Sequence, residues 1–124
     1  MSDASPVLKD GANEHPVPSA WRPTIERIVA SLAADELPCV PGVMPMTTEL
    51  LEYISLNVEC YGVRLVSLPE ETWQSSVCQW MIDYWQVLVD LYSEEEGRSD
   101  LVLFLRVYER EGSYEMEVTS VHVP

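Results

Sequence analysis

The sequence predicts an α+β fold: two or three N-terminal helices packed on one face of an antiparallel meander of three to four strands. Apolar residues recur at helical spacing from Ile25 to Leu32, and they alternate with other residues from Trp85 onward. Short polar connections join the alternating segments, and strands joined in this way are antiparallel neighbours. We expect a single α+β domain over residues 21–124, behind a disordered tail formed by residues 1–20.

The tail prediction rests on composition, because residues 1–20 contain four Pro or Gly residues and scattered charges without periodicity. The first helix is expected to begin near Pro23, since proline is tolerated in the first turn of a helix. Its buried stripe would contain Ile25, Ile28, Val29 and Leu32, and it would end near Ala34.

Residues 37–46 contain three prolines and a glycine, so we expect a connector there. A second helix is predicted after Thr47 or Thr48, either of which can cap its first turn, and Gly62 can end it. The apolar stripe of this helix is formed by Leu50, Leu51, Ile54 and Val58.

The middle of the chain allows two interpretations. Ser67 and Glu70 have capping-box spacing, which favours a third helix from about Pro69. Residues 76–82 could belong to that helix or extend the following strand. Residues 63–66 are a candidate fourth strand.

The C-terminal third alternates with period two. Its three expected strands bury their apolar rows on the helical side, and residues 93–99 and 111–113 are turns. The members of these rows are Trp85, Val87, Val89, Leu91; Leu101, Leu103, Leu105, Val107; and Tyr114, Met116, Val118.

Acidic residues outnumber basic residues by 21 to 7, which gives a net charge of −14. This balance argues against nucleic-acid binding and against binding to an anionic membrane, and it favours a basic protein partner. Solubility alone also accounts for such a charge. The N-terminal residues lack the pattern of a signal peptide, so a cytoplasmic location is expected. Cys39, Cys60 and Cys78 form no CxxC pair and are expected to be free thiols, with no metal or cofactor.

The stretch from Trp85 to Val107 reads W-x-V-L-V-D-L-Y-x-E-E-E-G-R-S-D-L-x-L-x-L-R-V. It resembles a family of small bacterial proteins catalogued as domains of unknown function, with the similarity strongest from Leu68 through Pro124. This resemblance implies a bacterial origin and no assigned activity. The order of elements, helices followed by a meander, also resembles cystatin-like and NTF2-like cone folds and small immunity proteins.

The acidic hairpin loop is the most distinctive local feature. Clustered carboxylates can bind a hard cation, but the loop lacks the alternating ligand spacing of an EF-hand, and a solvated loop explains it as well. Carboxylates flanked by tyrosines could also bind a protein. The leading hypothesis is therefore a non-enzymatic protein-interaction module of immunity or regulatory type. Its predicted partner-binding residues are Asp90, Tyr92, Glu94, Glu95, Glu96, Arg98, Asp100 and Tyr108.

The alternative is a small-molecule-binding or weakly enzymatic cone-fold protein with a pocket between helices and sheet. The pocket would contain Trp73, Trp80, Trp85 and His122, although the tryptophans could equally form a filled core. His122 is expected in the last strand, on the row of Tyr114, Met116 and Val118. It could act as a general base if Asp83 or Asp90 oriented it. No known catalytic motif occurs, which favours the non-enzymatic hypothesis. A third possibility is a homo-oligomer formed through the outer sheet face.

Overall fold

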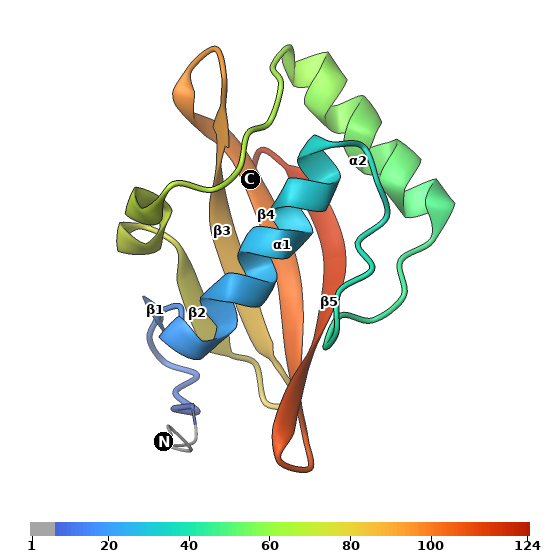
Figure 1. Ribbon diagram of the computed structural model, residues 1–124. Coiled ribbons are helices and arrows are strands. Elements are labelled where there is room, and N and C mark those ends of the chain that lie inside the picture. Colours follow the sequence, from blue (N-terminus) through green and yellow to red (C-terminus); the bar gives the residue numbers. More distant parts are fainter. Residues whose placement is uncertain (1–6) are drawn as a thin grey trace.

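A computed structural model describes residues 7–124, which form one antiparallel sheet with two α-helices on one of its faces (Figure 1). The sheet order is β1 (His15–Pro16), β2 (Val77–Trp80), β3 (Trp85–Ser93), β4 (Gly97–Arg110) and β5 (Ser113–His122). Every neighbouring pair is antiparallel. The predicted α+β class is confirmed, but residues 7–124 contain five strands where three or four were expected.

Helix α1 (Arg22–Ala33) follows a short 3₁₀ helix, η1 (Ser19–Trp21), and has a proline in its first turn as predicted. Its buried residues are the four members of the predicted stripe: Ile25, Ile28, Val29 and Leu32. They belong to one core cluster with the inner side chains of the sheet, so α1 is held to the sheet by apolar packing.

Helix α2 (Thr48–Tyr61) begins and ends where its capping residues predict. The Thr47 hydroxyl oxygen accepts a hydrogen bond from the Leu50 N–H at 3.1 Å, and Gly62 ends the helix with a left-handed φ of 94°. Only Ile54 of its stripe is fully buried, because α2 lies beside β5 at the margin of the sheet (Figure 1). Neither α-helix in residues 7–124 has the length and apolarity that crossing a bilayer requires.

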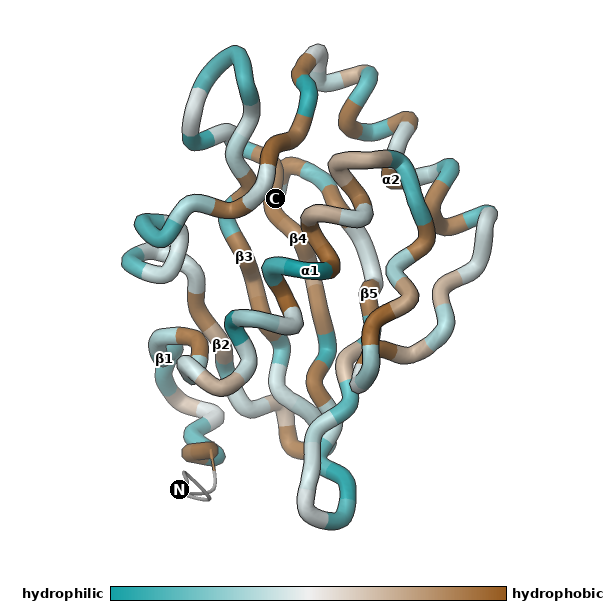
Figure 2. Tube along the Cα trace, in the orientation of Figure 1, coloured by the Kyte–Doolittle hydropathy of each residue, from teal (hydrophilic) through white to brown (hydrophobic). Residues whose placement is uncertain are grey.

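The alternating apolar rows of β3 and β4 face the helices, as predicted. Val87 pairs with Leu105 and Val89 with Leu103 across the two strands, and all four side chains are completely buried. Hydrophobic segments therefore run along the middle of the sheet beneath α1 (Figure 2). Burial of this continuous row is the main source of stability.

The predicted third helix is wrong. Residues Glu70–Gln74 form only a short 3₁₀ helix, η2, and β2 occupies the ambiguous segment as a strand. Pairing with β3 satisfies the backbone of β2, and hydrogen bonds fix η2 to the same strand: Thr72 Oγ1 donates to the Asp90 carbonyl at 2.7 Å. Residues 63–66 make only an isolated bridge, Leu65 with Ser93, and are no full strand.

The N-terminal segment differs from the predicted disordered tail. Residues 1–6 lie outside the described residues, but residues 7–20 pack against the sheet, and β1 extends the sheet beyond the edge of β2. Val17 is completely buried, and the Trp85 indole N–H donates to the Leu8 carbonyl at 3.0 Å. Composition alone misses this docking because the contacts join residues more than 60 positions apart.

A β-bulge near the end of β5 reverses the predicted orientation of His122. Phe104 pairs with Ser120 and Leu105 with Val118, so one extra residue, Thr119, lies between the two pairs. Val121 is therefore completely buried, and His122 is on the opposite face, where its ring stacks on Phe104 at 4.2 Å. His122 does not share the row of Met116 and Val118 as expected.

Candidate functional site

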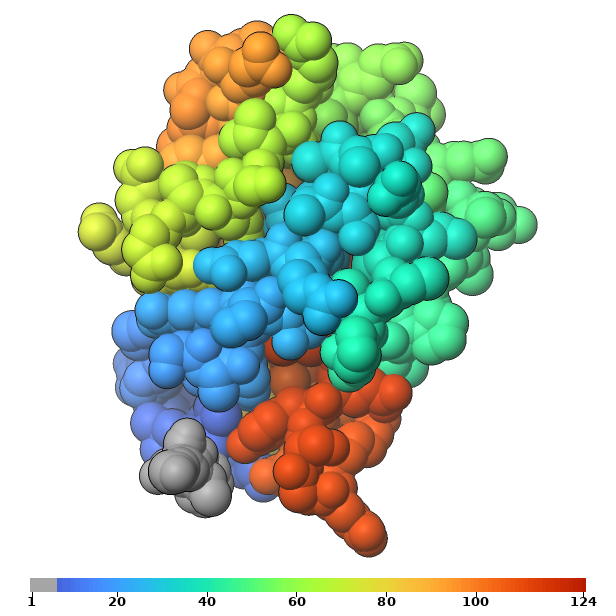
Figure 3. Space-filling model, viewed as in Figure 1, coloured from blue at the N-terminus to red at the C-terminus, as the bar shows by residue number. Residues whose placement is uncertain are grey.

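Carboxylates from three separate segments gather at the end of the sheet that carries the β3–β4 hairpin. We call this the acidic pole and define it by Asp35, Glu59, Glu94, Glu95 and Glu96. Asp35 follows α1, Glu59 belongs to the last turn of α2, and the three remaining glutamates form the hairpin turn. Figure 3 shows the hairpin side by side with the segment that follows α2.

Hydrogen bonds within the chain hold two of the three hairpin glutamates, and the third, Glu94, makes only a longer ion pair with Arg64 at 3.7 Å. The Glu95 carboxylate accepts hydrogen bonds from the Arg64 backbone N–H at 2.9 Å and from its Nε–H at 3.4 Å. The hydrogen bond from the Arg64 backbone lowers the pKa of Glu95, which favours the charged form. The Tyr61 hydroxyl donates to Glu96 at 2.9 Å. The loop is thus tied to residues 61–64, which leaves Glu94 the least engaged of the three.

Between the hairpin and the two helices lies a groove of about 380 Å³. The apolar residues on its floor are Leu32, Ile54, Val58, Val63 and Leu65. Its charged rim is formed by Asp35, Glu59, Glu94 and Arg64. An apolar floor beneath a mainly acidic rim suits a ligand with an apolar part and a positive charge.

The ends of both helices reinforce the negative potential of this groove. Helices α1 and α2 each end beside it, and neither has a basic residue in its last turn. The C-terminus of a helix carries a partial negative charge that favours cations. The Ser55 hydroxyl donates to the Asp35 carboxylate at 2.5 Å, which ties α2 to the end of α1. Arg64, the one cationic residue on the rim, is engaged with Glu94 and Glu95.

The structure separates the residues predicted to form the partner-binding loop. Tyr92 is buried, and Tyr108 lies near the far end of β4, roughly 30 Å away at ~3.3 Å per strand residue. The expectation that both tyrosines flank the acidic loop is therefore wrong. Asp90 accepts a hydrogen bond from the Ser75 hydroxyl at 2.5 Å and pairs with Arg98 at 3.4 Å.

With Asp90 and Arg98, Asp100 lines a separate hollow of about 510 Å³ near the C-terminus. Glu94 is the only member of the predicted set that reaches the groove rim. Most of the predicted set therefore lies outside the groove.

The four residues of the alternative pocket do not come together either. Trp85 is completely buried in the core, and Trp73 is buried with its indole N–H donating to Glu26 at 3.3 Å. Trp80 is half-buried against Trp85 at the opposite end of the sheet from the acidic pole. His122 is on the other face, where its Nδ1 lies 2.6 Å from the Ser120 hydroxyl. Within residues 7–124, neither Asp83 nor Asp90 forms a hydrogen bond with His122, so the expected orienting carboxylate is not in place.

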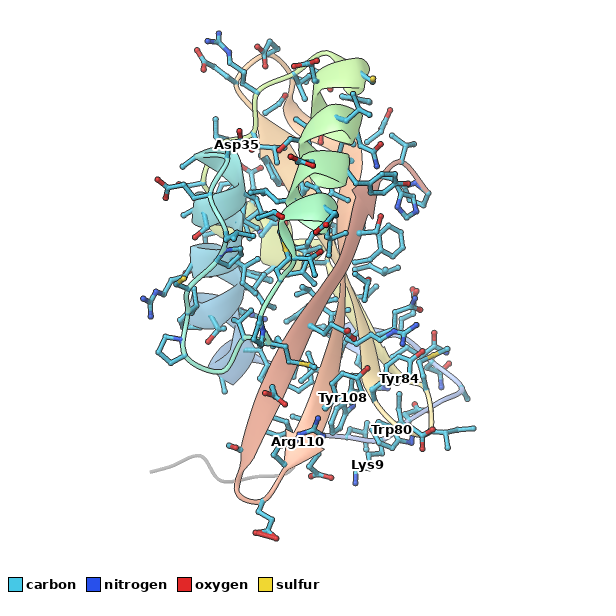
Figure 4. The ribbon with its side chains drawn as sticks, turned by 90° about the vertical axis from the view of Figure 1, so that its right-hand side faces the viewer. Lys9, Asp35, Trp80, Tyr84, Tyr108 and Arg110 are labelled. Carbon is cyan, nitrogen blue, oxygen red and sulfur yellow. The ribbon has the colours of Figure 1, made fainter. Side chains whose placement is uncertain are left out.

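Cationic groups stack on aromatic rings at the end of the sheet away from the acidic pole (Figure 4). The stacked pairs are Lys9 on Trp80, Arg106 on Tyr84 and Arg110 on Tyr108, at 4.7–5.1 Å from the ring centroids. Lys9 also pairs with Glu109 at 2.8 Å, and Arg110 with Glu115 at 3.1 Å. These charges largely neutralise one another, so this end of the sheet offers less charge selectivity than the acidic pole. The homo-oligomer expected through the outer sheet face, which holds Phe104 and Tyr108, stays a prediction.

Sequence reasoning missed Asp35, Glu59 and Arg64 because they belong to three segments that only the fold brings together. One signal was available. Each predicted helix has an acidic residue in its last turn or just after it, and no basic residue in that turn, which is the reverse of the usual preference at helix C-termini.

Residues 25–124 match the family model described as Domain of unknown function (DUF7668). The match covers both α-helices except the first turn of α1, strands β2 to β5 and the whole acidic pole. No curated protein and no solved structure matches the chain significantly.

Proposed function

Because this chain belongs to the family described as Domain of unknown function (DUF7668), which names no activity, we propose a function from its geometry. The chain is a non-enzymatic protein-interaction domain that binds a basic segment of a partner protein at the acidic pole. The observation that carries this proposal is the groove, whose apolar floor lies beneath Asp35, Glu59 and Glu94.

The groove supports a specific binding mode. Its volume of about 380 Å³ accommodates one large apolar side chain on the floor formed by Leu32, Val58 and their neighbours. Lysine or arginine residues on either side of that apolar residue would lie beside the rim carboxylates and the two helix C-termini. Burial of the apolar side chain would supply affinity, and the charges would supply selectivity and a fast encounter.

The net charge of the protein acts in the same direction. A charge of −14 attracts basic segments over several ångströms and repels acidic ones, and the attraction weakens as salt shortens the Debye length. A domain that covers a basic surface of another protein can neutralise the charge of that surface or regulate the activity of that protein. An immunity or regulatory role therefore fits this binding mode.

The test is isothermal titration calorimetry at low salt with a capped pentapeptide, Lys-Lys-Leu-Lys-Lys. Replacing its central Leu with Gly should weaken binding roughly tenfold or more, because burying a Leu side chain contributes about 1.5–3 kcal/mol. The triple variant Asp35→Asn, Glu59→Gln, Glu94→Gln should also bind at least tenfold more weakly. These substitutions keep the shape of each side chain, and Asn tolerates the left-handed φ of 57° at Asp35.

A matched control removes the same number of charges elsewhere. Glu14, Glu52 and Glu111 are exposed and lie outside the groove lining, so changing all three to Gln alters only the overall charge. This control should weaken binding less than threefold. Equal losses in the two triple variants would show that net charge alone attracts the peptide, and the proposed groove would have to be abandoned.

A further inference from the structure

The outer face of the sheet has no helical layer. Both α-helices lie on the inner face, so within residues 7–124 no α-helix covers the opposite side of β3, β4 and β5 (Figure 4). Leu88 pairs with Phe104 across β3 and β4, and each lies between two completely buried residues of its own strand. Side chains alternate along a strand, so Leu88 and Phe104 point to the outer face.

The middle of this face is apolar, and charged rows lie on both sides of it. Phe104 is half-buried in the central row, and its ring stacks on the His122 ring at 4.2 Å. One neighbouring row contains Arg106 and Glu117, and the other contains Asp90 and His122. An apolar centre inside a polar rim is the usual arrangement at protein–protein interfaces.

The outer face is nearly neutral although the chain is strongly acidic. Three of the seven basic residues lie on it: Arg98, Arg106 and Arg110. It holds only four of the 21 acidic residues: Asp90, Asp100, Glu115 and Glu117. Almost all of the net charge of −14 therefore lies elsewhere. A basic partner is drawn to those other surfaces, whereas a second copy of this acidic chain meets the least repulsion here.

The two charged rows complement each other when two copies meet face to face. A two-fold axis that crosses the strands at Phe104 places the Arg106–Glu117 row of one copy over the Asp90–His122 row of the other. Guanidinium groups then lie beside carboxylates, and glutamates beside imidazoles. Each of these contacts occurs twice, because the same patch of both copies forms a symmetric interface.

The size of the face fits a reversible dimer. Strands β2 to β5 contain 4, 9, 14 and 10 residues. At ~3.3 Å per residue and ~4.8 Å between strands, they present a face of roughly 600 Å². Two copies would thus bury roughly 1,200 Å², which is the lower end of the range for specific interfaces. We expect a dissociation constant in the micromolar range.

We propose that the outer face joins two copies of this chain in a symmetric dimer with Phe104 at its centre. The groove of the acidic pole lies between the hairpin and the helices, on the other side of the sheet, so both grooves of the dimer stay open. The dimer is therefore independent of the proposed function. A partner protein with two basic segments would bind such a dimer more tightly than a single copy.

Sedimentation velocity of the full chain at physiological salt tests the association. From low micromolar concentration to about 0.5 mM, the mass should rise from one copy to two. Phe104→Glu should weaken the dimer by roughly a hundredfold or more, because two central side chains are lost at once. Arg106→Glu changes an exposed residue and places like charges opposite each other, so it should weaken the dimer at least tenfold.

Leu56→Glu is the matched control, because Leu56 is 55% exposed on α2 and lies off the outer face. It should change the dissociation constant less than threefold. A wild type that stays monomeric at about 0.5 mM would overturn the proposal and leave this face to a different partner protein. Equal weakening by Leu56→Glu and Phe104→Glu would also overturn it, since general hydrophobic association would then explain the mass.

A second measurement needs no substitution. Phe104 is the single phenylalanine of the chain, so selective labelling identifies its ring signals without ambiguity. In a mixture of copies labelled at leucine methyls and copies labelled at phenylalanine, isotope-filtered spectra should show contacts between Leu88 of one copy and Phe104 of the other. A dimer without these intermolecular contacts would place the interface elsewhere and refute the proposal.

Discussion

Truncating Val17 tests whether the N-terminal segment is part of the folded structure. Val17 is completely buried in the core cluster, between β1 and η1. A disordered tail would make its side chain irrelevant to stability. If the segment is docked, Val17→Ala should lower the free energy of unfolding as other large-to-small substitutions in a core do.

The structure gives the size of the expected effect. Val→Ala removes two methyl groups, each worth about 0.8 kcal/mol when fully buried, which gives about 1.6 kcal/mol. The cavity left behind raises the total to about 2–3 kcal/mol. Leu8 belongs to the same segment but is 63% exposed, so Leu8→Ala should lower the free energy of unfolding by less than about 0.5 kcal/mol.

Urea unfolding followed by tryptophan fluorescence measures both variants against the wild type. The midpoint for Val17→Ala should fall clearly, with an unchanged slope, and the midpoint for Leu8→Ala should hardly move. Two variants with the same small loss would refute the docking of residues 7–20.

Three further predictions concern single residues. The buried Cys78 thiol has a pKa raised to about 11 by desolvation, so at pH 8 it should react with an aromatic disulfide only after unfolding, while the other two cysteines react at once. Hydrogen bonds from His15 and nearby N–H groups lower the pKa of Asp10 from 3.8 to about 2. Asp10 thus contributes stability that is present above about pH 4 and is lost as the pH falls through 2, and Asp10→Asn should lack this loss in acid titrations. Gly62→Ala should lower the free energy of unfolding in urea by about 1–2 kcal/mol, because an L-residue is strained at a φ of 94°. No atom lies within 4 Å of the added Cβ, so this backbone strain is the whole of the expected effect.

Local patterns predict much of this fold. The stripe from Ile25 to Leu32, the cap at Thr47 and the stop at Gly62 each involve residues within a few positions of one another. The alternation in β3 and β4 likewise identifies the buried face. Such signals can be read from the sequence because their physical causes are local.

The remaining features depend on contacts between distant residues. Residues 77–80 form a strand because their backbone pairs with β3. Thr119 forms a bulge because the residues before it and after it in β5 pair with β4 in registers that differ by one residue. One inserted residue is enough to move His122 to the other face. The groove needs Asp35, Glu59 and Glu94 together, although each belongs to a different segment of the sequence.

Mapping the bound peptide onto the backbone tests the central claim most directly. Two-dimensional ¹H–¹⁵N spectra of the wild type, titrated at low salt with the Lys-Lys-Leu-Lys-Lys peptide, report which amides the peptide contacts. We predict that the largest shifts cluster at Asp35, residues 55–65 and Glu94, and that they shrink as salt is added. Shifts concentrated around Tyr84 and Tyr108 on the uncovered sheet face would contradict the assignment of the acidic pole as the binding site.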